Sequence, residues 1–311
     1  MNRRTRGRWL FLALAVGVPL AALANSFRAA PLPAPPELVG ELPPASPPAE
    51  MALVHLPTGL TRRSAGFAYR GGAFSDRREF TMSAALVRHP RGDVLIDTGF
   101  GRDIDAHFGQ MPLYFRATTR YEAATPAAQQ LGATGYARAR LRGILLTHAH
   151  WDHVSGVPDF PGTPVLVPAE ERAFIAEGGS LTAVAREFAE VRYEEYRFDG
   201  GPYLGFPASH DLYGDGAIVV VPAFGHTPGS VIVFVTLPGE RRYAFLGDLV
   251  WQLEGITQRA ERAWPLRVLA DADAEGVREN LLRVAAIAAR FPEIVLVPAH
   301  DARSFASLPR L

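Results

Sequence analysis

Three of the nine histidines in this chain lie within six residues, in an H-x-H-x-D-H pattern that runs from His148 to His153. The pattern directly follows an apolar segment that ends at Leu146. In an extended chain, residues i and i+2 point the same way, so His148 and His150 can converge on one ion. A turn after His150 would carry Asp152 and His153 to a neighbouring position. Neutral imidazole and carboxylate are ligands that suit zinc or iron. The pattern therefore predicts a metal site.

Three later segments repeat this arrangement, because each ends an apolar run with one further residue of a ligand type. Residues 218–221 lead to His226 in Gly-His-Thr-Pro-Gly, residues 243–246 lead to Asp248, and residues 294–297 lead to His300. Functional side chains on loops that a rigid sheet holds in place are the expected arrangement. Each segment alone is a weak signal of a metal ligand. Their order after the histidine pattern makes the whole set a strong signal of a metal site.

The elements that must position these side chains alternate between strands and helices. Short β-branched runs predict buried strands at residues 94–96, 143–146, 218–221, 231–235 and 294–297. Asp215-Gly216 before the third of these runs indicates a hairpin. Asp273 begins an amphipathic pattern that ends at Phe291-Pro292 and predicts a capped helix. The mixture predicts an α/β protein in which helices cover sheets.

Composition excludes several other chemistries. The 311 residues are 48% hydrophobic and 21% charged, as in a globular protein. No cysteine is present, which excludes disulfides, thiolate ligands and a cysteine nucleophile. All 32 basic residues are arginine, which excludes lysine chemistry. With 32 acidic residues the net charge is zero, so we expect no nucleic-acid partner.

The first fifty residues read as a leader and a linker. Four arginines precede a charge-free run over residues 9–24 that closes with Ala22-Leu23-Ala24. This is typical of a secretory signal peptide, so we expect residues 1–24 to be removed and the protein to be periplasmic or secreted. The alternative is an uncleaved membrane anchor at residues 9–24. Eight of residues 31–48 are proline, which predicts an extended linker over residues 25–50 and a folded domain over residues 51–311.

From about residue 84 to residue 300 the chain resembles the metallo-β-lactamase fold hydrolase superfamily. The resemblance rests on Asp97-Thr98-Gly99, the H-x-H-x-D-H pattern, the glycine-flanked His226, Gly247-Asp248 and the final His300, in the family's order. It implies a four-layer αββα sandwich with the site at one edge of the sheets.

The resemblance also implies a site for two divalent metal ions, with zinc the favoured metal. His148, His150 and His226 would bind one ion; Asp152, His153 and His300 would bind the second; and Asp248 would bridge the pair. Asp97 would orient a ligand imidazole. Asp152 is the candidate residue for proton transfer during the reaction. Two ions ~3.5–4 Å apart can share a hydroxide that attacks an electrophilic carbonyl or phosphorus.

The resemblance favours a hydrolase that opens a small lactone or ester, similar to N-acyl homoserine lactonases, with a small molecule as its partner. Some lactonases place a tyrosine three residues after the bridging aspartate, where this chain has Trp251. Phosphotriesters, thioesters and β-lactams are alternative substrates, and a di-iron redox enzyme is an alternative class. Aromatic residues between Phe100 and Tyr121 fit either an acyl-chain pocket or ordinary core. We expect the remaining histidines to be surface or hydrogen-bonded residues: His55, His89, His107 and His210.

Overall fold

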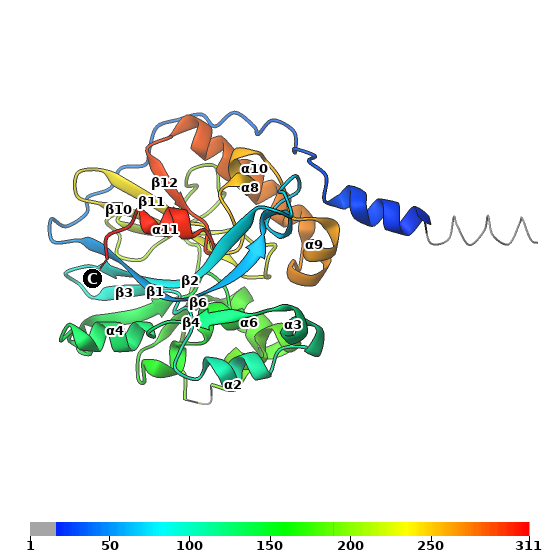
Figure 1. Ribbon diagram of the computed structural model, residues 1–311. Helices are drawn as coiled ribbons and strands as arrows, with labels where there is room; N and C mark the ends of the chain where they lie inside the picture. Colours follow the sequence, from blue (N-terminus) through cyan, green and yellow to red (C-terminus); the bar gives the residue numbers. More distant parts are fainter. Residues whose placement is uncertain (1–16, 189, 311) are drawn as a thin grey trace, which may run out of the picture.

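The computed structural model describes residues 17–188 and 190–310 (Figure 1). Most of the expected leader, residues 1–16, lies outside the described residues, and residues 17–26 are helical. No helix in the described ranges is both long enough and apolar enough to span a bilayer. Cleavage of the leader, export, and the division into linker and domain all stay predictions.

The first sheet has seven strands in the order β4-β1-β2-β3-β5-β6-β7. Its long strands β1 and β2 pair antiparallel, whereas β3, β5, β6 and β7 run parallel to one another. The strands are β1 (Ala52–Ser64), β2 (Arg77–Arg88), β3 (Asp93–Ile96), β4 (Tyr121–Ala123), β5 (Leu141–Leu145), β6 (Val165–Pro168) and β7 (Tyr193–Tyr196).

The second sheet has five strands in the order β12-β11-β10-β9-β8. Within it, β11 and β12 are parallel and the other neighbours are antiparallel. The strands are β8 (His210–Asp211), β9 (Ile218–Pro222), β10 (Val231–Leu237), β11 (Arg241–Phe245) and β12 (Ile294–Val297).

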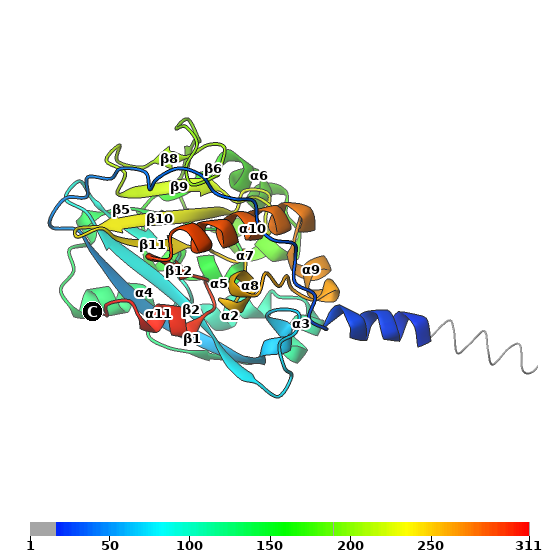
Figure 2. The ribbon, with the colours of Figure 1, turned by 90° about the horizontal axis from the view of Figure 1, so that it is seen from above.

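Helices cover the outer face of each sheet (Figures 1 and 2). One group follows the strands of the first sheet: α2 (Ile104–Gly109), α3 (Leu113–Thr118), α4 (Ala127–Ala133), α5 (Trp151–Val154), α6 (Ala169–Glu177) and α7 (Ala183–Arg186). The other group belongs to the second sheet and the C-terminal end: α8 (Glu254–Thr257), α9 (Trp264–Ala270), α10 (Ala274–Arg290) and α11 (Ala302–Ala306).

Three buried clusters separate the layers. One cluster lies between the first sheet and its helices, a second lies between the two sheets, and a third lies between the second sheet and α10. Helix, sheet, sheet and helix are therefore stacked in four layers, and the predicted αββα sandwich is confirmed.

The predicted strands and the capped helix all occur. Asp273 caps α10 by accepting a hydrogen bond from the backbone N–H of Glu275, and the helix ends at Arg290, just before Phe291. The sequence patterns did not reveal the long strands β1 and β2. Pro57 and Gly59 flank a shift in register within β1. Both residue types are unusual inside strands, so the sequence of β1 does not have the pattern of a strand.

The proline-rich segment is extended, and it lies against the folded domain. Leu32 donates its backbone N–H to the Arg259 carbonyl at 2.8 Å, and Ser46 donates to the Asp215 carbonyl at 2.7 Å. Leu32, Leu38 and Leu42 are partly buried against the third cluster. In Figure 2 this segment runs in dark blue across the molecule past α10. Backbone hydrogen bonds and leucine side chains therefore fasten the segment along its length.

Candidate metal centre

The predicted ligand residues all follow strands whose ends meet at one edge of the two sheets. β5 ends three residues before His148, and the short helix α5 that follows carries Asp152 and His153. The second sheet contributes the other three through the loops after β9, β11 and β12: His226, Asp248 and His300. The structure thus brings all seven predicted residues to one place, although they span more than 150 residues of sequence.

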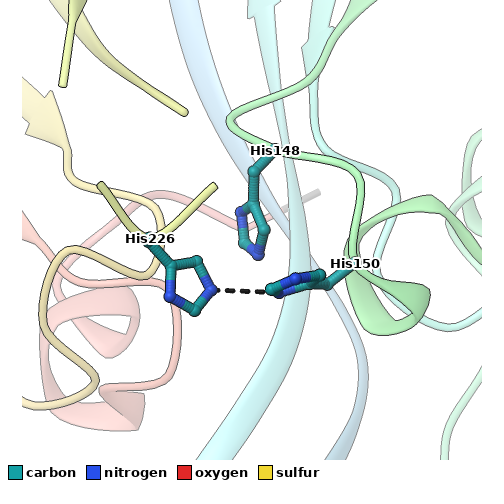
Figure 3. Close-up of side chains that lie close together, drawn as sticks. All are labelled: His148, His150 and His226. Atoms are coloured by element: carbon teal, nitrogen blue, oxygen red, sulfur yellow. Dashed lines mark hydrogen bonds between the residues drawn. The ribbon is translucent and has the colours of Figure 1, made fainter. Parts of the chain in front are cut away.

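Three imidazole rings form the first group, and Figure 3 shows them turned toward one another. One ligand atom from each of His148, His150 and His226 lies within 4.8 Å of the others. The Nε2 atom of His226 and the Nδ1 atom of His150 are 3.0 Å apart. All three residues are buried. Three convergent imidazole nitrogens are a common zinc-ligand set.

Asp248 occupies the middle of the site. Its Oδ1 atom lies 3.0 Å from His300 Nε2 and 3.4 Å from His153 Nε2. Its Oδ2 atom lies 3.5 Å from His226 Nε2 and 4.0 Å from His148 Nε2. One carboxylate therefore faces imidazoles of both predicted metal positions, which is the position that a bridging ligand requires.

Asp152, His153 and His300 form the second predicted position. The Oδ2 atom of Asp152 lies 3.6 Å from His300 Nε2. Asp152 is only partly buried, in contrast to the six other predicted ligands. It is therefore the member of the set that is most open to a substrate.

The polar atoms at the centre lack protein partners. Among the described residues, His148 Nε2, His150 Nε2, His153 Nε2 and Asp248 Oδ1 are buried without a hydrogen bond. A buried polar atom left unpaired costs about 1–3 kcal/mol, so such a concentration of them requires a compensating group. Divalent cations would satisfy His148 Nε2, His153 Nε2 and Asp248 Oδ1, and the residues present therefore fit a metal centre.

Burial and neighbouring charges set the protonation of the ligands. Burial lowers the pKa of His148 and of His150 well below the usual range, and nearby imidazoles act in the same direction. Both rings are therefore neutral, which is the form that binds metal. Burial alone would raise the pKa of Asp248, but His300 and His153 outweigh it and lower that pKa well below its usual range.

Asp97 holds His153 in place, which is the role that the family resemblance implies for this carboxylate. Its Oδ2 atom accepts hydrogen bonds from His153 Nδ1 at 2.8 Å and from the Thr147 hydroxyl at 2.7 Å. Its Oδ1 atom accepts the backbone N–H of Thr147 at 2.7 Å. Because Asp97 binds the far side of the ring, it fixes which nitrogen of His153 faces the site.

Sequence reasoning missed a second carboxylate of this kind. Asp271 accepts the Nδ1–H of His226 at 3.0 Å, and the buried Arg262 forms an ion pair with the same oxygen. Arg262 also donates to the backbone carbonyl of Asp248 at 2.8 Å. The only sequence signal was the position of Asp271 just before α10, which does not indicate a contact with a loop 45 residues away.

Glu171 is a further buried carboxylate that the sequence did not single out. Its side chain accepts the Ala149 N–H at 2.6 Å, the Thr227 hydroxyl at 2.6 Å and the Gly229 N–H at 3.1 Å. Burial raises the pKa of Glu171 to about 7, against the effect of these hydrogen bonds. The carboxyl group joins the loop that carries His148 and His150 to the loop that carries His226.

Trp251 stands where some lactonases have tyrosine, and it contacts the central aspartate. Its indole N–H donates to Asp248 Oδ2 at 2.8 Å. The Arg262 guanidinium lies 4.8 Å from the centre of a Trp251 ring. Trp251 is therefore attached to the metal centre through Asp248.

The aromatic segment between Phe100 and Tyr121 belongs mostly to the core, and the acyl-chain pocket stays a prediction. Phe100 and Met111 are buried in the core, and Phe108 and Phe115 pack on Trp151. Tyr114 instead is 54% exposed. Most of the segment therefore packs against Trp151, next to the predicted ligands His150 and Asp152.

The remaining histidines lie apart from the metal centre, within the described residues. His55 contacts the Ser83 hydroxyl at 2.9 Å, His89 contacts Asp215 at 3.0 Å and His107 contacts the Ser155 hydroxyl at 2.9 Å. His210 stacks on Tyr196 with a centroid distance of 4.9 Å.

Comparison with known proteins identifies the fold. The family model described as the metallo-beta-lactamase superfamily matches residues 78–300. The chain belongs to the metallo-beta-lactamase superfamily. A probable metallo-hydrolase of Mycobacterium tuberculosis, Rv2300c, is 32% identical over 228 residues, covering 70% of this chain and 73% of that protein. The N-acyl homoserine lactonase AttM of Azorhizobium caulinodans is 26% identical over 191 residues, covering 58% and 70%. The chain is thus a metal-binding hydrolase of this superfamily.

Solved structures share the superfamily fold at low sequence identity. An N-acyl homoserine lactone hydrolase with N-hexanoyl-L-homoserine at its catalytic metal centre has a TM-score of 0.66 and 16% identity, and covers 83% of this chain and 96% of its own. AidC, a dizinc quorum-quenching lactonase, has a TM-score of 0.59 and 16% identity, and covers 83% and 90%.

Proposed function

We propose that this metallo-beta-lactamase superfamily member binds two zinc ions and opens a small lactone or ester that carries an acyl group. The observation that carries the proposal is the position of Asp248, within 4.0 Å of imidazole nitrogens from both predicted metal positions. In this proposal His148, His150 and His226 hold one ion; Asp152, His153 and His300 hold the other; and Asp248 bridges them.

Two bound ions would supply a hydroxide at neutral pH and polarise the substrate carbonyl. The chain's own residues prepare the site for that chemistry. Asp97 and Asp271 fix the orientation of His153 and His226. Asp152, the least buried of the proposed ligands, would take a proton and return it to the departing alkoxide oxygen.

The choice of a lactone or ester is supported by the relatives. AttM is named an N-acyl homoserine lactonase, and two of the similar structures hold a product of that reaction. We further propose that the protein acts outside the cytoplasm, because residues 1–24 have the pattern of a signal peptide.

A substrate panel with metal analysis tests the proposal. We expect two zinc ions per chain and turnover of N-acyl lactones or aryl esters that a chelator abolishes and added zinc restores. The same panel includes a phosphotriester, a thioester and a β-lactam, and preference for one of these would replace the lactone. Two irons together with oxygen consumption would overturn the hydrolase assignment.

His150→Ala is the matched variant for the same assays. Loss of one imidazole should remove the first ion and reduce turnover to background. His210→Ala is the control, because His210 lies outside the metal centre. Normal turnover by the His150 variant would refute the ligand assignment.

A further inference from the structure

The large apolar side chains that the described residues expose are concentrated at one end of the molecule. Eleven such side chains are exposed, and nine of them lie on four segments. These segments are the N-terminal helix with Val18, Leu20 and Leu23; the loop with Phe74; α3 with Leu113 and Tyr114; and α9 with Trp264, Val268 and Leu269. We call these nine residues the apolar end.

Both views place these segments together. In Figures 1 and 2, α3 and α9 lie at the same end, and the N-terminal helix projects from that end in dark blue. Phe74 belongs there as well, because its ring lies 5.3 Å from the ring of Phe27, which follows the helix. Single exposed apolar residues are ordinary, but a concentration at one end marks an interaction surface.

The extent of exposure shows how little the protein covers this surface. Leu113 is 73% exposed, Val268 is 65% exposed and Trp264 is 56% exposed. The short helices α3 and α9 have no buried residue between them. Both helices therefore present apolar side chains outward.

The N-terminal helix indicates which partner fits. Residues 17–24, Gly-Val-Pro-Leu-Ala-Ala-Leu-Ala, contain no polar side chain, and every one of them is exposed. A helix that is apolar on all sides requires an apolar medium rather than one complementary face. In sequence it ends the charge-free run of residues 9–24, which four arginines precede. We propose that the chain keeps this helix, as in the alternative of an uncleaved anchor, and that the apolar end docks on the surface of a lipid bilayer.

The residue types around the apolar end suit a membrane interface. Trp264 and Tyr114 are amphipathic aromatic residues, and this class is enriched at the level of lipid headgroups. Arg116 and Arg120 are exposed on and just after α3, where they can meet anionic headgroups. A second copy of the chain is the competing occupant, and it leaves the exposed arginines unexplained.

Two helices that carry the apolar end, α3 and α9, lie next to residues that support the metal centre. On α3, Phe115 packs on Trp151 with a centroid distance of 5.9 Å, and Trp151 lies between His150 and Asp152. α9 ends directly before Asp271, which holds His226. If the proposed function holds, an acyl-bearing substrate dissolved in the outer layer of the membrane could reach the site without passing through water. This last step rests on the proposed function, whereas the docking does not.

Tryptophan fluorescence can report the docking directly. The chain has four tryptophans; Trp9 lies in the leader, Trp151 is buried, Trp251 bonds to Asp248, and Trp264 is exposed. The full chain with Trp9→Phe is mixed with vesicles of phosphatidylcholine and phosphatidylglycerol whose acyl chains are brominated. We expect a blue shift and quenching of the emission, and Trp264→Phe in the same background should remove most of both.

Two results would overturn the docking. If the chain sediments with vesicles while Trp264 is not quenched, the leader alone holds the chain, and α3 and α9 do not contact the bilayer. If the Trp264 emission instead shifts with protein concentration in the absence of lipid, together with a dimer in sedimentation, a second copy covers the surface.

A pair of matched variants tests the access of substrate. Val268→Asp should weaken vesicle binding and slow turnover of a long-chain lactone dissolved in vesicles at least several-fold, with a short, water-soluble ester turned over at the normal rate. Val39→Asp, at an exposed valine away from the apolar end, should leave both rates unchanged. Equal long-chain rates in the two variants would overturn the access route. Absence of all turnover, with Trp264 still quenched, would instead reject the proposed function and leave the docking intact.

Discussion

Asp271 accepts the Nδ1–H of His226 at 3.0 Å, and it shares that oxygen with Arg262. Burial alone would raise the pKa of Asp271, but Arg262 and His226 outweigh it and lower that pKa below its usual value. The carboxylate is therefore ionised at neutral pH and holds the ring of His226 by its Nδ1–H. Arg262 is the cation that keeps this buried charge in place.

Removal of that cation should loosen the metal centre. In Arg262→Met the Asp271 carboxylate is buried without its ion pair, and Asp248 loses a donor to its backbone carbonyl. We expect metal affinity and kcat/KM to fall about 10–100-fold, as for other groups that orient ligands. Metal content after dialysis against a graded chelator measures the affinity. Arg262→Lys should recover part of the loss.

Arg267→Met is the matched control for this prediction. Arg267 pairs with Glu261 at 2.8 Å on the same stretch of chain. If this variant lost metal as readily as the Arg262 variant, general destabilisation of the segment would explain both.

Trp251→Phe isolates one hydrogen bond to the central aspartate. The phenyl ring keeps most of the packing on Phe80 and Arg262 but cannot donate to Asp248 Oδ2. We expect kcat/KM to decrease about tenfold with a small change in melting temperature. Trp264→Phe, assayed without lipid, controls for the loss of an indole. Unchanged kinetics in the Trp251 variant would show that this hydrogen bond does not support catalysis.

Glu171 should contribute more to the free energy of unfolding than a typical acidic residue on the surface. Glu171→Ala leaves three buried donors without an acceptor, on Ala149, Thr227 and Gly229. Each unpaired buried group costs about 1–3 kcal/mol. We therefore expect the free energy of unfolding to decrease by at least about 1 kcal/mol and by no more than several kcal/mol. Urea unfolding of the chelated protein measures this.

Glu170→Ala supplies the comparison, because Glu170 is the exposed neighbour on the same helix. It should change stability by less than about 0.5 kcal/mol. Similar losses in the two variants would mean that α6 itself, rather than the link between the two loops, accounts for the effect.

His55 should make the protein sensitive to acid. Burial, with a contribution from Arg310, lowers the pKa of His55 from 6.5 to about 4. Below pH 6.5, His55 therefore binds a proton in the unfolded chain but not in the folded chain. The free energy of unfolding consequently falls as the pH decreases from about 6.5 to about 4. His55→Gln can keep the contact with Ser83 and removes the titration. The melting temperature of the variant should fall less than that of the wild type between pH 7 and pH 5, and parallel curves would contradict the prediction.

Much of the site could be predicted from sequence because each ligand follows a short buried strand. The ends of such strands meet at one sheet edge, so local patterns were enough to gather residues as distant as His148 and His300. The residues that orient the ligands could not be found in this way. Asp271, Arg262 and Glu171 act across loops far apart in sequence, and an isolated Asp, Arg or Glu in a helix or loop resembles any solvated charge.

The fold was predicted less completely where local pattern and tertiary environment disagree. β1 contains Pro57 and Gly59 yet pairs along most of its length with β2, since the sheet absorbs them at a register shift. The proline-rich segment was expected to be extended, and it is, but its leucines at positions 32, 38 and 42 gave no sign that they pack on the second sheet's helical layer.

The attachment of that segment changes what residues 27–50 can do mechanically. A free proline-rich chain of about 24 residues would extend to roughly 75 Å from its point of attachment, at ~3.1 Å per residue. Here Leu32, Ser46 and the Arg242 side chain, which donates to the Pro43 carbonyl at 3.1 Å, fasten the segment to the domain. The segment therefore fixes the orientation of the domain and does not act as a long flexible spacer. In a chain that keeps the N-terminal helix, the attached segment sets the orientation of the domain relative to that helix.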